Sequence, residues 1–134
     1  MGGRGASSGT SIKGEKYGTE YHAVKRNGSA LVIGNVKFIK QNKKGSSTAP
    51  METMTKGRVY AFIDSGDRLN SIIYFNENLK RKKSINLLHG HKNIKGAHTH
   101  EGYLHDENGT HRLTTKERRM VARVTKIWYN LNSK

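Results

Sequence analysis

The sequence predicts an α+β domain in which an antiparallel β-meander sheet packs against a C-terminal amphipathic helix. Short runs rich in Val, Ile, Phe and Tyr alternate with turn residues between positions 21 and 88, which is typical of strands. Near position 114 the spacing of apolar residues changes from that of a strand to that of a helix. The length of 134 residues suits one domain with its own core.

The chain divides into a lead segment and a single domain. Residues 1–18 are rich in Gly and Ser and almost free of apolar side chains. Such a segment buries too little surface to offset the entropy lost on ordering, so we expect a flexible arm. Residues 19–134 then form one basic α+β domain.

Strands are expected in order along the chain, with polar turns between them. A bend at Gly34-Asn35 divides the first expected strand region, and turns are expected at residues 65–67 and 76–78. No helix is expected before the sheet. The expected strand regions are residues 30–40, 57–64, 69–75, 79–88 and 97–104.

The C-terminal segment has both a start signal and an apolar face for a helix. Thr114 and Glu117 have the spacing of a capping box, in which each side chain satisfies a backbone N–H at the start of the helix. The apolar residues that follow lie on one helical face: Met120, Val121, Val124, Ile127, Trp128 and Leu131.

The charge of the chain indicates a polyanionic partner. There are 25 Lys and Arg against 10 Asp and Glu, a formal charge of +15. This excess favours nucleic acid over a membrane surface. RNA is favoured over DNA because histidines can cleave RNA without a metal ion. The chain has no cysteine and no apolar run long enough to span a membrane, and no phosphate-binding loop of the GxxxxGKS/T type occurs.

Histidines are concentrated in one stretch, with six of the seven between positions 89 and 111. His98 and His100 are the most informative, because side chains two apart on a strand point to the same face. Such a pair can act as general base and general acid, or both can bind one metal ion together with His105 or Asp106. The third alternative is a surface histidine cluster without catalysis.

For RNA cleavage a base removes the 2′-hydroxyl proton, an acid protonates the leaving 5′-oxygen, and a cation stabilises the phosphoryl oxygens. We therefore assign His98, His100, His105, Lys82 and Arg112 as candidate catalytic residues. No metal and no cofactor is expected, since carboxylate ligands for Mg²⁺ are few and no HExxH motif occurs.

The candidate nucleic-acid-binding residues are basic and lie in two groups. The alternative for residues 80–83 is an edge strand on which lysines prevent aggregation. The two groups are Lys80, Arg81, Lys82 and Lys83, and Arg118, Arg119 and Arg123 on the polar face of the helix.

Three segments give the chain a resemblance to a known family: GRGASSG at 3–9, METMTKGRVYAFID at 51–64 and HTHEGYLHDENGTHRLTTKERR at 98–119. It resembles the small toxin-like nuclease domains of the barnase/EndoU/colicin/RelE-like superfamily, in the form carried by phages and mobile elements, often C-terminal to head-associated proteins. The resemblance implies an α+β domain that cleaves RNA without metal, using a strand histidine, His98 or His100. Such folds often begin with helices, and this chain departs from that pattern.

The function expected from these observations is that of a phage-type, metal-independent endoribonuclease. The alternative is a non-enzymatic phage protein that binds nucleic acid, or an anti-defence protein that binds a phage or host complex. Either would act in the cytoplasm of the host cell or in the virion. The two classes differ in whether His98 and His100 converge on a site that also holds a cation.

Overall fold

The computed structural model describes residues 21–42, 56–87, 97–102 and 109–132. The predicted arm at residues 1–18 lies outside this part of the chain. The strands are β1 (Tyr21–Ala23), β2 (Lys25–Arg26), β3 (Ser29–Ala30), β4 (Val32–Ile33), β5 (Val36–Gln41), β6 (Val59–Ile63), β7 (Leu69–Phe75), β8 (Arg81–Asn86), β9 (His98–Glu101) and β10 (Thr110–Arg112). One helix follows them, α2 (Thr115–Asn132).

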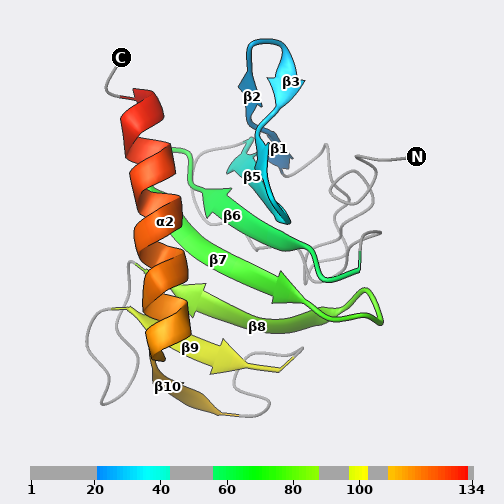
Figure 1. The fold of residues 1–134 in the computed structure, drawn as a ribbon, viewed down its shortest axis with the longest axis vertical. Coiled ribbons are helices and arrows are strands. Elements are labelled where there is room, and N and C mark those ends of the chain that lie inside the picture. Colours follow the sequence, from blue (N-terminus) through cyan, green and yellow to red (C-terminus); the bar gives the residue numbers. More distant parts are fainter. Residues whose placement is uncertain (1–20, 43–55, 88–96, 103–108, 133–134) are drawn as a thin grey trace.

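The main sheet has the spatial order β1-β5-β6-β7-β8-β9-β10, with β4 also paired to β5 (Figure 1). From β6 to β10 each strand pairs with the next in antiparallel orientation, so the predicted meander is confirmed in this region. The predicted α+β class, with a C-terminal helix against the sheet, is also confirmed.

One strand pair departs from the antiparallel prediction. β5 and β6 are parallel, with Val36 opposite Val59 and Ile39 opposite Phe62. Parallel neighbours require a crossover connection between the two strands, whereas antiparallel neighbours can be joined by a tight turn. The expectation of antiparallel neighbours was wrong for this pair, because strand patterns in the sequence do not indicate whether the chain turns back or crosses over between two strands.

The helix begins as the capping box predicts. The backbone N–H of Glu117 donates to Thr114 Oγ1 at 3.2 Å, and the backbone N–H of Thr114 donates to Glu117 Oε1 at 2.8 Å. Val124 and Trp128 are buried, and Met120, Val121 and Ile127 pack partly buried against the same core. The predicted apolar face of the helix is therefore confirmed at these five positions.

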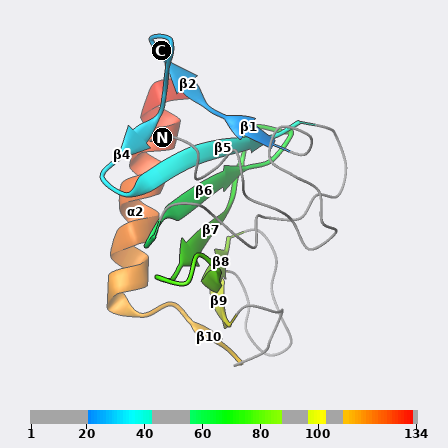
Figure 2. The same ribbon diagram turned by 90° about the vertical axis from the view of Figure 1, so that its right-hand side faces the viewer.

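The two faces of the sheet have separate sets of buried residues. α2 covers one face, as the edge-on view shows (Figure 2), and the core between them includes Phe38, Ile63 and Ile72. Tyr21, Ile39, Tyr60, Phe62, Ile73 and Phe75 form a second buried cluster. All five residues of β6 are buried, as expected for a strand whose two faces are both covered.

β8 lies inside the sheet, between β7 and β9. The edge-strand alternative for residues 80–83 is therefore wrong, because the backbone of Lys83 pairs with Tyr74 on one side and Glu101 on the other. No helix in the described part of the chain is long and apolar enough to cross a membrane.

Candidate functional site

β9 separates two groups of polar side chains, one on each face of the sheet. Thr99 Oγ1 donates to Glu117 Oε1 of α2 at 3.0 Å, so Thr99 faces the helix. Because successive strand residues point to opposite faces, His98 and His100 point away from the helix. The sequence prediction that these two histidines share a strand face is confirmed.

The His98–His100 pair is a direct contact between two buried imidazoles. Their Nε2 atoms lie 3.0 Å apart, and their ring centroids lie 4.7 Å apart with the ring planes at 81°. The residues are 1% and 7% exposed. On its other side, His100 Nδ1 lies 3.0 Å from Thr110 Oγ1, since Thr110 is the residue opposite His100 on β10.

These contacts restrict where the protons lie. A neutral imidazole carries one N–H, so one Nε2 donates to the other, which accepts. If His100 Nε2 accepts, His100 Nδ1 donates to Thr110 Oγ1; if His100 Nε2 donates, the Thr110 hydroxyl donates to Nδ1. The two rings cannot both be imidazolium in this contact, since two like charges about 3 Å apart repel strongly. The pair therefore holds a single proton between its Nε2 atoms.

Two predicted catalytic cations lie on the same face as this pair. Arg112 lies opposite His98 in the β9–β10 register and is exposed. Lys82 is exposed and is the extra residue of an irregularity in the pairing with β7. On the β9 side the register continues through it, because the backbone N–H of Gly102 donates to the Lys82 oxygen at 2.7 Å, and this places Lys82 in line with the histidine face. Four of the five candidate catalytic residues thus share one face, and the fifth, His105, lies outside the described residues.

The basic run at residues 80–83 is divided between the two faces. Lys83 Nζ donates to Glu117 Oε2 at 2.7 Å and lies 4.7 Å from the centre of the Tyr74 ring. Its charge is thus paired with a carboxylate of the helix. Lys80 and Lys82 are exposed, and Arg81 is partly buried.

The predicted basic residues of α2 lie on the other side of the sheet from the histidines. Arg118, Arg119 and Arg123 are exposed. Since α2 covers the face opposite the His98–His100 pair, these three arginines and the pair belong to different surfaces (Figure 2).

Six residues on the helix face form what we call the helix-side cluster. Tyr74, Lys83, Thr99 and Glu117 are joined by direct contacts, and the Glu101–His111 pair lies beside them. Glu117 is only 2% exposed. Its burial acts to raise the pKa of its carboxyl, but hydrogen bonds from Lys83, Thr114 and Thr99 and the charge of Lys83 outweigh this and hold the pKa below its usual value. Burial, with the charge of Glu117, raises the pKa of Tyr74 to about 12.

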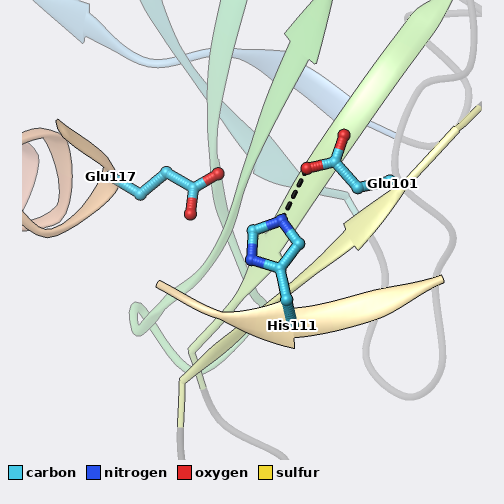
Figure 3. Close-up of side chains that lie close together, drawn as sticks. All are labelled: Glu101, His111 and Glu117. Atoms are coloured by element: carbon cyan, nitrogen blue, oxygen red, sulfur yellow. Dashed lines mark hydrogen bonds and ion pairs between the residues drawn. The ribbon is translucent and has the colours of Figure 1, made fainter. Parts of the chain in front are cut away.

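His111 links β10 to β9 within this cluster (Figure 3). Its Nδ1 lies 2.6 Å from the backbone oxygen of Arg112, and its Nε2 lies 2.6 Å from Glu101 Oε2. The Arg112 carbonyl, followed by the Glu101 carboxylate, raises the pKa of His111. Both acceptors are satisfied when His111 is an imidazolium that donates from both nitrogens.

Glu101, His111 and Glu117 also place possible ligand atoms within 4.8 Å of one another. The hydrogen bonds explain this grouping without an ion. Glu117 Oε1 accepts from Thr99 and Thr114, its Oε2 accepts from Lys83, and both nitrogens of His111 face acceptors. The arrangement is that of a structural network joining α2, β8, β9 and β10.

The roles of Glu101, Thr110 and His111 were not predicted from the sequence. No local pattern marks Thr110 and His111, and their positions follow from the pairing of β10 with β9, which places Thr110 opposite His100 and His111 opposite Thr99. Comparison of the chain with protein-family models, curated proteins and solved structures finds no match.

Proposed function

We propose that the protein is a basic RNA-binding protein that cleaves RNA without a metal ion, with the His98–His100 pair as its acid and base. The observation that carries this proposal is the contact of 3.0 Å between the two Nε2 atoms, on the face that Lys82 and Arg112 share. The net charge of +15 supports a phosphate-rich substrate. The resemblance to phage-borne toxin-like nucleases supports the same reaction.

In this reaction one neutral imidazole takes the proton of a ribose 2′-hydroxyl, and the 2′-oxygen forms a bond to the adjacent phosphorus. The P–O5′ bond breaks, and the other histidine, as imidazolium, protonates the leaving 5′-oxygen. The products are a 2′,3′-cyclic phosphate and a 5′-hydroxyl. Arg112 and Lys82 stabilise the charge on the phosphoryl oxygens.

The direct contact between the two imidazoles allows the pair to return to its starting protonation state after each cleavage. After cleavage the base carries the proton and the acid has lost it. A single proton transfer between the two Nε2 atoms restores the starting state. Because each Nε2 faces the other and both rings are buried, we expect RNA binding to separate the two imidazoles.

The experiment that tests the proposal is incubation of labelled single-stranded RNA and DNA with the purified protein, with and without EDTA. His98→Asn and His100→Asn are the test variants, and His22→Asn, at an exposed site on β1, is the matched control. EDTA-resistant RNA cleavage that is lost only in the test variants is expected. Cleavage that both test variants retain contradicts the assignment.

The burial of the pair favours a second candidate function, a nucleic-acid-binding protein without catalysis. Each imidazole has the other as a hydrogen-bond partner, and both residues are less than a tenth exposed, as in a structural contact. Salt-dependent RNA binding without cleavage, unchanged in His98→Asn, is the result that selects this function.

A further inference from the structure

The distance between the two imidazole nitrogens of the His98–His100 pair is close to that of two ligands on one metal ion. Zinc–nitrogen bonds measure about 2.0–2.1 Å, so two nitrogens in a tetrahedral site lie roughly 3.3–3.4 Å apart, and somewhat closer when the angle at the ion narrows. The two Nε2 atoms are 3.0 Å apart. We propose that His98 and His100 bind a divalent transition-metal ion of the zinc class through these atoms, in place of the proton between them.

The orientation of His100 also fits a metal ligand. Histidines that bind metals usually donate the N–H of their other ring nitrogen to a fixed acceptor, which leaves the ligating nitrogen unprotonated. Thr110 Oγ1 occupies that position, 3.0 Å from His100 Nδ1. The rings meet at an angle rather than end to end, because their centroids are only 4.7 Å apart.

The ligand chemistry selects the class of ion. Imidazole nitrogen suits Zn²⁺, Co²⁺, Ni²⁺ and Cu²⁺, whereas Mg²⁺ and Ca²⁺ require oxygen ligands. Among the described residues of β8, β9 and β10, no carboxylate shares the histidine face, since Glu101 points to the helix-side cluster. Only unprotonated ring nitrogens bind such an ion, so it takes the place of the proton between the two Nε2 atoms.

The metal and the acid–base reaction compete for the same nitrogens. A bound ion occupies the lone pairs that would accept and pass on a proton, so we expect zinc to inhibit RNA cleavage. This consequence rests on the proposed function, whereas the binding site itself does not. The two are therefore tested by separate readouts.

The binding test is calorimetric titration of the EDTA-treated, dialysed full chain with ZnCl₂. We expect one ion per chain, with at least a tenfold loss of affinity in His98→Asn and in His100→Asn. His111→Asn removes a histidine from the opposite face and is expected to leave zinc binding unchanged. Saturable binding that both pair variants retain, or no saturable binding by the wild-type chain, overturns the proposal.

A second measurement keeps the test decisive if the buried variants fail to fold. Histidine side-chain NMR of the wild-type chain reports which imidazoles respond to zinc, and Co²⁺ is expected to broaden the His98 and His100 signals first. Perturbation of other histidines alone overturns the proposal. Zinc binding with no RNA cleavage in any condition contradicts only the proposed function, and cleavage without zinc binding contradicts only the metal site.

Discussion

Lys83 Nζ lies 2.7 Å from Glu117 Oε2 and joins the middle of the sheet to the first turn of α2. The side chain of Glu117 is 2% exposed and that of Lys83 is 19% exposed, so this ion pair is largely shielded from water. Glu117 also closes the capping box with Thr114. A single carboxylate thus fixes both the start of the helix and its position on the sheet.

We expect Glu117→Gln to lower the free energy of unfolding by about 2–3 kcal/mol, because it leaves the charge of Lys83 without its partner in a poorly hydrated site. Denaturant unfolding at neutral pH measures this loss. Glu77→Gln, in the exposed turn before β8, is the matched control and should change stability by less than about 0.5 kcal/mol. Equal stability of the two variants would show that the ion pair contributes nothing.

His111 makes stability depend on pH. Its pKa in the folded protein is raised by the Arg112 carbonyl and by Glu101, above a value of about 6.5 in the unfolded chain. The folded state therefore binds the proton more tightly, so the stabilisation is complete below about pH 6.5 and is lost as the pH rises through the folded pKa. The free energy of unfolding, measured from below pH 6.5 upward, should decrease as the pH rises. In His111→Asn this decrease should be smaller. An unchanged pH profile in that variant would contradict the imidazolium assignment.

Local patterns in the sequence predicted much of the fold. The capping box at Thr114 and Glu117 and the apolar face containing Val124 and Trp128 are properties of one segment, and both are confirmed. The hairpin of β2 and β3 was not among the expected elements, although Asn27-Gly28 is a typical two-residue hairpin turn and both residues have positive φ. The signal was present, but each strand has only two residues.

Contacts between distant segments explain what the sequence did not predict. The alternation rule placed His98 and His100 on one face, but nothing local indicates that Thr110 of another strand contacts His100. The run at residues 80–83 is one basic patch in the sequence, yet the register with β9 places Lys83 and Lys82 on opposite faces. Lys83 is also paired with a carboxylate 34 residues away. Strand pairing and helix docking decide these roles.

Thr110 is expected to position His100 for the proposed reaction. Thr110→Val keeps the shape of the side chain and removes the hydroxyl that faces Nδ1, so we expect at least a tenfold lower rate of RNA cleavage and an altered pH profile. Thr110→Ser keeps the hydroxyl and should retain most of the rate. Nitrogen chemical shifts of His100 in the two variants report the protonated ring nitrogen directly. Equal cleavage rates for Thr110→Val and Thr110→Ser would show that the hydroxyl does not position His100.

The separation of the two basic surfaces predicts which one holds the scissile phosphate. Lys82 and Arg112 share the histidine face, whereas Arg118 and Arg119 lie on the helix side. We expect Lys82→Gln/Arg112→Gln to lower the cleavage rate at saturating RNA at least tenfold. The slope of log affinity against log salt should also become shallower, by about 0.7 for each phosphate that the variant no longer neutralises.

Arg118→Gln/Arg119→Gln removes the same charge from the helix side, so it is the matched control for this prediction. Any change in RNA affinity that this variant causes arises through the surface of α2. The cleavage rate at saturating RNA should stay unchanged, because neither arginine lies on the face of the His98–His100 pair. Single-turnover cleavage and salt titrations of both double variants make the comparison. The reverse pattern would place the bound RNA on α2 and exclude the histidine face as the site of cleavage.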